Sequence, residues 1–245
     1  MDLPDPYRDP DLVTLYDTDN PAGRDHRYYR ELADALGART VVDLGCGTGL
    51  LTRALATGTP RVTGVDPSPT MLDFARRQPG SERVRWVLGD AATIPPTGDI
   101  DLVVCTGNAV QHIPTDGLPA ALRHVADALR PGGVLAFESR NPARREWQEW
   151  TRPATEGERR TPFGRLREWL EVTVAEDGRV VLDAHNVIDD GEDRVYTSVL
   201  HFRTAAELTA HLLAAGFSRV QVDGDWDGGP VTDASRILVF RAVRG

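Results

Sequence analysis

Hydrophobic and polar residues follow two different patterns along the chain, and the change falls near residue 165. Before it, between residues 40 and 140, short apolar runs alternate with segments of helical period. The runs cover residues 41–44, 61–65, 84–88, 101–105 and 133–137. Short buried strands that alternate with helices are typical of a parallel sheet wound with helices. This part of the chain therefore predicts an α/β fold.

The clearest helical pattern covers residues 118–130, and a Pro-Gly-Gly sequence at 131–133 is expected to end the helix. Its apolar face carries Leu118, Ala121, Leu122, Val125 and Leu129. A shorter amphipathic helix is marked by Tyr28, Tyr29, Leu32 and Leu36. Residues 1–20 are rich in Asp and Pro, so we expect them to be partly extended unless they fold over a ligand.

After residue 165 the pattern changes to alternating strands at 166–174, 179–188 and 194–202. The first two are expected to form a hairpin at Asp177-Gly178, a pair that readily adopts positive φ angles. Thr204 and Glu207 then form a capping box for a helix that ends at Gly216. The residues expected to face inward from this helix are Leu208, Leu212 and Leu213. Two final strands are predicted at 219–222 and 236–242.

A chain of 245 residues with 40 % hydrophobic residues fits one large domain. We expect a single domain over 1–245 with four parts. Residues 1–36 would form a helical cover, 37–142 the ligand-binding core, 143–203 a linker and β insertion, and 204–245 the last helix and two strands.

The charge balance argues against a polyanionic partner. The chain has 28 Lys and Arg against 37 Asp and Glu, a formal net charge of −9. Basic residues between 140 and 160 are interrupted by acidic ones, which is typical of a solvated, salt-bridged face rather than a nucleic-acid site. The two cysteines form no CxxC pair and no apolar run approaches membrane-spanning length, so we expect a cytoplasmic protein with no membrane partner.

A glycine-rich turn follows the first predicted strand. Residues 41–49 read Val-Val-Asp-Leu-Gly-Cys-Gly-Thr-Gly, and a helical segment follows at once. Glycines let a ligand approach the main chain, and the N–H groups at the start of the helix face an anionic group. The spacing is GxGxG, and Leu50 stands where the dinucleotide fingerprint has its third glycine. This departure favours a nucleoside ligand other than a dinucleotide.

Carboxylates follow the next two strands. Asp66 ends the second strand, where it can accept hydrogen bonds from both hydroxyls of a ribose. Asp90 and Ala91 follow the third strand, where a carboxylate and an N–H can meet the edge of an adenine ring. Each residue alone is also an ordinary turn former. Three consecutive strand ends with such chemistry predict a nucleoside site.

These residues resemble the class I S-adenosylmethionine-dependent methyltransferase family over about residues 25–140. The motifs are VVDLGCGTG at 41–49, GVDPSPTML at 64–72, GDA at 89–91 and LRPGGVLAFES at 129–139. The resemblance implies a Rossmann-like sheet of seven strands with the last strand antiparallel. It also implies S-adenosylmethionine as the cofactor, with S-adenosylhomocysteine as product. The expected cofactor-binding residues are Tyr16, Tyr29, Gly45, Cys46, Gly47, Asp66, Pro67, Met71, Asp90, Ala91, Thr106 and Gly107.

The methyl acceptor is expected to bind beyond the fourth strand. This segment differs from the Asn-Pro-Pro-Tyr box of enzymes that methylate the amino groups of adenine, cytosine or glutamine. His112 is the candidate general base, although it could instead bond to the backbone or touch only the cofactor. The expected acceptor-binding residues are Asn108, Arg140, Asn141, Trp147 and Trp150. Trp169, in an alternating strand, is expected in a core, and the histidines lack metal-ligand spacing.

The sequence thus predicts an enzyme that transfers a methyl group to an O or N atom of a small molecule by direct displacement. The insertion at 143–203 resembles the lid of small-molecule methyltransferases, or it could be a sheet that pairs two subunits, so the chain would be a monomer or a homodimer. Two alternatives are a nicotinamide-dependent oxidoreductase, disfavoured by Leu50 and by Asp90 with Ala91, and a cofactor-binding protein without transfer activity.

Overall fold

Seven strands form the central sheet of the computed structural model, which describes residues 5–175 and 179–245. They are β1 (Thr40–Leu44), β2 (Arg61–Asp66), β3 (Val84–Leu88), β4 (Ile100–Cys105), β5 (Leu129–Arg140), β10 (Phe217–Asp223) and β11 (Ile237–Arg244). Their order across the sheet is β10-β11-β5-β4-β1-β2-β3, and β11 runs antiparallel to both of its neighbours. The expected α/β fold, with a mostly parallel sheet and an antiparallel last strand, is confirmed.

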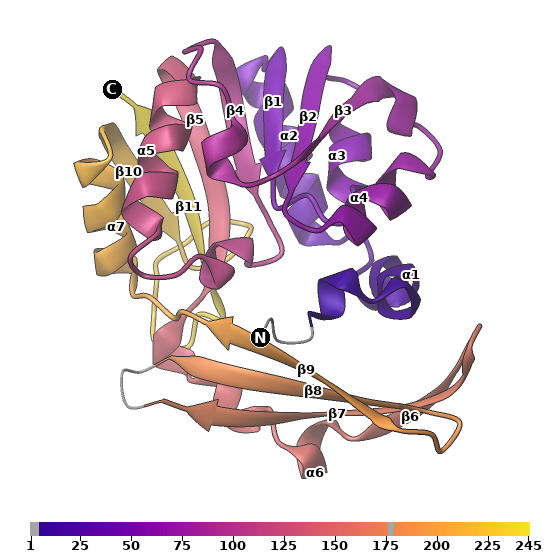
Figure 1. The fold of residues 1–245 in the computed structure, drawn as a ribbon. Helices are drawn as coiled ribbons and strands as arrows, with labels where there is room; N and C mark the ends of the chain where they lie inside the picture. Colours follow the sequence, from indigo (N-terminus) through magenta and orange to yellow (C-terminus); the bar gives the residue numbers. More distant parts are fainter. Residues whose placement is uncertain (1–4, 176–178) are drawn as a thin grey trace.

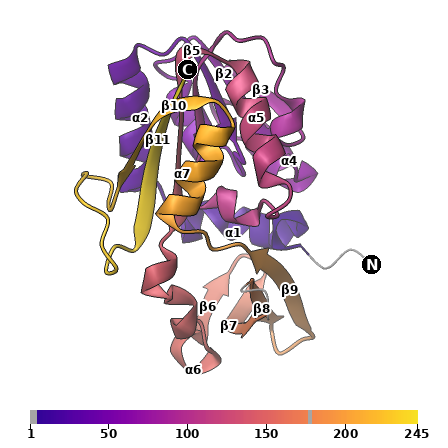
Figure 2. The same ribbon diagram turned by 90° about the vertical axis from the view of Figure 1, so that its left-hand side faces the viewer.

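Helices cover both faces of this sheet (Figure 2). The helices α2 (Arg24–Leu36) and α3 (Leu50–Leu55) bury Tyr29, Ala33 and two leucines against one face. On the other face, α5 (Leu118–Ala128) and α7 (Ala205–Ala214) pack around the stacked rings of Phe137 and Phe240, whose centroids are 4.6 Å apart. The short helix α4 (Pro69–Arg76) follows β2.

Two details of the helices differ from the prediction. Helix α5 ends at Ala128 rather than Arg130, because Leu129 already pairs with Ile100 as the first residue of β5. Leu213, expected to face inward, is 51 % exposed, whereas Leu208 and Leu212 are buried as predicted. Spacing alone placed all three leucines on one face, but the sheet covers only the narrower strip that carries two of them.

The insertion forms a second, antiparallel sheet of four strands instead of the expected three. They are β6 (Gly157–Thr161), β7 (Gly164–Val174), β8 (Val180–Ile188) and β9 (Asp193–Leu200), in that order. The unpredicted β6 is an edge strand of sequence Gly-Glu-Arg-Arg-Thr. Charged edge strands resist pairing with other chains and lack the apolar alternation that reveals a strand. The hairpin expected at Asp177-Gly178 lies outside the described residues.

The residues before the core are helical, not extended. Residues 6–8 form a 3₁₀ turn and α1 covers Pro10–Asp19, while Asp5 and Asp9 cap these elements with their side chains. An aspartate followed by a proline is a strong helix start, which composition alone did not reveal. We call residues 5–19 the strap, because α1 lies between the central sheet and the second sheet (Figure 1).

Hydrogen bonds fix the strap on both sides. Toward the core, the Ser68 hydroxyl donates to the carbonyl of Tyr7 at 2.5 Å. Toward the second sheet, the Tyr196 hydroxyl donates to the carboxylate of Asp9. Among the residues that the structure describes, no helix is long and apolar enough to cross a membrane.

Candidate active site

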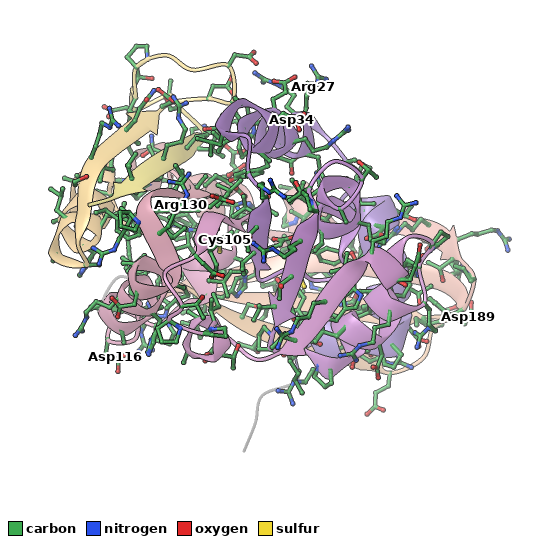
Figure 3. The ribbon with its side chains drawn as sticks, turned by 90° about the horizontal axis from the view of Figure 1, so that it is seen from above. Arg27, Asp34, Cys105, Asp116, Arg130 and Asp189 are labelled. Carbon is green, nitrogen blue, oxygen red and sulfur yellow. The ribbon has the colours of Figure 1, made fainter. Side chains whose placement is uncertain are left out.

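A cavity of about 740 Å³ opens at the carboxyl ends of β1 to β4, between the central sheet, the strap and β9. Cys105, at the end of β4, is buried and lines this cavity. It lies well inside the molecule, whereas Asp116 and Asp189 lie at the periphery of the molecule (Figure 3). Predicted site residues that line the cavity are Tyr16, Gly45, Gly47, Asp66, Pro67, Met71, Asp90, Ala91, Thr106, Gly107 and His112. A volume in this range suits a small-molecule or cofactor ligand.

The glycine loop owes its shape to three left-handed residues. Gly45, Gly47 and Gly49 have φ angles of 75°, 53° and 74°. A Cβ atom on Gly49 would lie 2.3 Å from the ring of Trp86, whereas one on Gly47 would be 4.0 Å from its nearest neighbours. The spacing GxGxG therefore follows from the backbone, and at Gly47 the missing side chain leaves the main chain open to the cavity.

Asp66 joins the loop to the start of α4. One carboxylate oxygen accepts a hydrogen bond from the N–H of Gly47 at 2.8 Å, and the other accepts from the N–H of Ser68 at 2.8 Å. Burial raises the pKa of Asp66, while these two bonds oppose the shift. Each oxygen keeps a second lone pair for a ligand hydroxyl, since a carboxylate has about four acceptor positions.

Asp90, after the end of β3, caps the 3₁₀ turn over Ala91–Thr93. The Asp90 carboxylate accepts from the N–H of Ala92 at 2.9 Å, and Ala91 is buried beside it. The Met71 side chain is 2 % exposed and forms part of the cavity wall. Asp90 is therefore the ordinary turn former that its residue type predicts, and it also faces the cavity.

Three aromatic side chains gather where the strap meets the segment after β4. The Tyr7 ring lies edge-on to Tyr16 and to His112, with centroid distances of 6.3 and 5.6 Å. The Tyr7 hydroxyl and His112 Nε2 are 3.4 Å apart. Desolvation by the surrounding protein, and then the charge of Arg140, lower the pKa of His112. The imidazole is therefore neutral at physiological pH and able to take a proton.

The residues expected to bind the acceptor lie outside the lining of the cavity. Arg140 donates to the side-chain oxygen of Gln111 at 3.0 Å and lies over the Trp150 ring at 5.2 Å. Trp147 and Trp150 both pack against Phe202. None of these residues is in the cavity lining. They pack against one another in the connection between β5 and the second sheet. Trp169, which the sequence places in a core, is buried in β7 of the second sheet.

Asn108 and Asn141 have backbone roles. The Asn141 amide donates to the carbonyls of Thr232 and Ser235 at 3.0 and 2.9 Å, which fastens the loop before β11. Asn108 adopts a left-handed φ of 58° in the turn after β4. Neither residue lines the cavity, and the buried Oδ1 of Asn108 has no hydrogen-bond partner among the described residues.

Tyr29 and Cys46, expected to bind the cofactor, are also outside the lining. Cys46 is buried on the sheet side of the glycine loop. Tyr29 is fully buried in α2, and its hydroxyl donates to Glu138 of β5. Glu138, which sequence reasoning missed, is 2 % exposed and also accepts from the N–H of Asn108 at 2.8 Å. A lone acidic residue within an apolar strand was the available signal.

Tyr7 is a second omission, since it lies in the segment expected to be extended. Its position beside His112 depends on the bond between its carbonyl and Ser68, a contact across 61 positions of the chain. The basic segment at 140–160 is salt-bridged as predicted, with Arg144 on Glu149 and Arg152 on Glu156. Within residues 5–175 and 179–245, no group of three or more His, Cys, Asp or Glu side chains could hold a metal ion.

Comparisons with known proteins agree with this geometry. Residues 41–133 match the family model of the methyltransferase domain. The chain is 31 % identical over 208 residues to the cypemycin N-terminal methyltransferase of a Streptomyces species, which covers 83 % of this chain and 82 % of that protein.

Two solved structures share the fold over nearly the whole chain. The CcbJ methyltransferase from Streptomyces caelestis is 24 % identical, with a TM-score of 0.78, and the match covers 98 % of this chain and 99 % of CcbJ. The amino pentose methyltransferase CalS10 from Micromonospora echinaspora, solved with S-adenosylmethionine bound, is 24 % identical, with a TM-score of 0.70, and the match covers 94 % and 97 % of the two chains.

Proposed function

This chain belongs to the class I S-adenosylmethionine-dependent methyltransferases, and on that premise we propose that it methylates the nitrogen of an amine in a small molecule. Membership of this family argues against the alternative of a nicotinamide-dependent oxidoreductase. The observation that carries the choice of acceptor is the neutral His112 beside Tyr7 in a cavity without a free cation. Arg8 is the one arginine among the described residues that line the cavity, and its side chain pairs with Asp5 at 3.5 Å.

The residues present fit the cofactor. Gly47 leaves its backbone open to the cavity, and Asp66 keeps lone pairs for hydroxyl groups. We propose that Gly45 and Gly47 hold the methionyl end, Asp66 the ribose, and Met71 with Asp90 and Ala91 the adenine. When bound, S-adenosylmethionine supplies a methyl group already activated by its sulfonium. The protein's own contribution is then alignment of the acceptor and removal of one proton.

An amine acceptor suits the proton chemistry of this cavity. Alkyl amines have pKa values near that of lysine, about 10.4, so they must lose a proton before the nitrogen can react. His112 Nε2 takes this proton, and its new N–H then donates to the Tyr7 oxygen 3.4 Å away. Burial raises the pKa of Tyr7, so its phenol stays protonated and neutral.

A carboxylate acceptor is less suited to the site. It would need a cation to balance its charge, and Arg140 is already bonded to Gln111 outside the lining. Two of the similar proteins are named for acceptors that carry an amine, the N-terminus of cypemycin and an amino pentose. Both support nitrogen as the methylated atom.

The strap and β9 complete the proposed acceptor pocket. Thr197, Ser198 and Val199 of β9 line the cavity together with Tyr7 and Tyr16 of the strap. Such a cover excludes water and restricts the acceptor to a compact molecule or to the end of a chain. The second sheet would therefore act as a lid.

Transfer of a labelled methyl group tests the proposal. The purified chain is incubated with labelled S-adenosylmethionine and a panel of amino sugars, amino-terminal peptides, phenols and carboxylates. We expect label on nitrogen, with S-adenosylhomocysteine as the second product. Transfer to phenols or carboxylates alone would refute the assignment of nitrogen while leaving the cofactor site intact.

A further inference from the structure

The turn that carries His112 is held by the segment after β9. His112 ends a 3₁₀ turn over Ala109–His112, which follows the end of β4. The backbone N–H of His201 donates to the carbonyl of Gln111 at 2.8 Å. Arg203, two residues further along, donates to the carbonyl of Val110 at 3.2 Å and to that of Ile113 at 2.5 Å. Three carbonyls around His112 therefore accept from one connection.

Arg203 is an unusual residue for such a position. It is 6 % exposed, and its bonds to described residues end on main-chain carbonyls. Burying a guanidinium is costly unless its donors are well used. The carbonyl of Val110 also accepts from the N–H of Ile113 at 3.3 Å, so the guanidinium adds a second donor there, and a cation near the end of the turn complements its dipole. The two terminal nitrogens of the planar guanidinium reach two carbonyls in a fixed geometry, whereas the buried Nε has no hydrogen-bond partner among the described residues.

The other end of the turn is fixed separately. Glu138 accepts from the N–H of Asn108, the residue that precedes the turn. With both ends held, the His112 ring has a defined place beside Tyr7. Since β9 lines the cavity at Thr197–Val199 and ends at Leu200, only a few residues separate that wall from Arg203.

We propose that Arg203 is a positioning residue, which holds the His112 turn in its working orientation and ties it to strand β9 of the second sheet. The inference rests on the proposed function, in which His112 is the base. Arg203 does not line the cavity and acts through the turn that carries His112. A change at Arg203 should therefore alter the proton-transfer step and leave cofactor binding intact.

The test compares Arg203→Gln and Arg203→Lys with Arg244→Gln. Arg244 is a matched control, because it also donates to a carbonyl, that of Gly216 at 2.9 Å, at the end of β11 remote from the cavity. We expect Arg203→Gln to lower kcat by about 10- to 100-fold, as misplaced catalytic groups do, with KM for S-adenosylmethionine changed by less than about twofold. Arg203→Lys, which keeps the charge but loses the two-nitrogen fork, should recover part of this loss.

The same substitution is then made in a His112→Ala background. If Arg203 acts through His112, Arg203→Gln should have little further effect on kcat there. An equal loss of kcat in both backgrounds, or a loss matched by the Arg244 control, would overturn the inference.

An NMR titration of the His112 ring, assigned by its absence from His112→Ala, needs no turnover. Arg140, Asp5, Tyr7 and His201 are the charged or titratable groups around this ring. We expect the pKa of His112 to rise toward its ordinary value in Arg203→Gln as the turn loosens, and an unchanged pKa would contradict the inference. If the wild type methylates no amine, the proposed function fails, whereas this titration still decides whether Arg203 positions His112.

Discussion

The hydroxyl of Tyr29 donates a hydrogen bond to a buried carboxylate oxygen of Glu138. The second carboxylate oxygen accepts from the N–H of Asn108, in the turn that leads to His112. Helix α2 on one face of the sheet and the wall of the cavity thus share one carboxylate. Burial raises the pKa of Glu138 to about 7.

A pH-dependent stability follows from this shift. The folded Glu138 carboxyl holds its proton more tightly than the unfolded one, whose ordinary pKa is 4.5. Relative to Glu138→Gln, the wild type should lose free energy of unfolding as the pH rises from 4.5 to about 7, by at most on the order of 3 kcal/mol. Urea denaturation across this pH range measures the difference. Glu31→Gln, at an exposed position of the same helix α2 that carries Tyr29, is the control variant for this measurement.

Tyr29→Phe should move the same transition. The Tyr29 bond lowers the pKa of Glu138, so its removal raises that pKa further and leaves a buried oxygen without its donor. We expect a loss of about 1–3 kcal/mol in the free energy of unfolding, with the pH transition moved upward. A variant as stable as the wild type at pH 8 would show that the bond contributes nothing.

Asp66→Ala should weaken cofactor binding. The variant loses the proposed ribose acceptor and also the bond that orients Gly47. Loss of hydrogen bonds to a charged carboxylate should raise the dissociation constant of S-adenosylhomocysteine about 10- to 100-fold, and calorimetry measures this constant. Asp73→Ala, an exposed carboxylate on α4, is the matched control. Equal affinities for the two variants would remove Asp66 from the site.

His112→Ala should slow turnover without weakening the cofactor. The expected fall in kcat is about 10²- to 10⁴-fold, the usual value of a general base. Because the pKa of His112 is lowered below 6.5, wild-type kcat should fall only when the pH drops beneath that value and stay level above it. The pH profile of kcat, with His211→Ala as a control on α7, tests both points. A His112→Ala variant that keeps both the kcat and the pH profile of the wild type would remove His112 as the base.

Gly49→Ala should destabilise the fold more than Gly80→Ala. Both glycines have left-handed φ angles, 74° and 84°, so either alanine costs about 1–2 kcal/mol in backbone strain. At Gly49 the new Cβ also meets Trp86 at 2.3 Å, whereas at Gly80 nothing lies within 4 Å. The clash adds about 1–3 kcal/mol, and the two melting curves compared side by side isolate it.

The sequence predicted the central sheet well because most of its strands are short segments rich in apolar residues that alternate with segments of helical period. The cofactor loop was readable for a similar reason. Gly45, Gly47 and Gly49 are each required by a positive φ, so the backbone dictates the residue type and the pattern is visible without a structure. Their roles toward a ligand stay predictions until the variants above are measured.

The acceptor side was harder to predict, since contacts distant in sequence build it. Tyr7 reaches the cavity only because Ser68 holds its carbonyl, and Arg140 turns away to Gln111. Trp147 and Trp150 were predicted to bind the acceptor, yet both rings pack against Phe202. Residue type predicts what a side chain can do, whereas these partners decide which way it faces.

The bond between Tyr196 and Asp9 joins residues 187 positions apart. At the usual pace of translation, about 5–20 residues per second, Asp9 is synthesised roughly 10–40 s before its partner. During that interval the second sheet is not complete, so the strap cannot pack against β9 and the cavity is not covered by it. A nascent chain that stops short of β9 would therefore hold β1 to β5 of the central sheet, without β10 and β11, beside an uncovered ligand site.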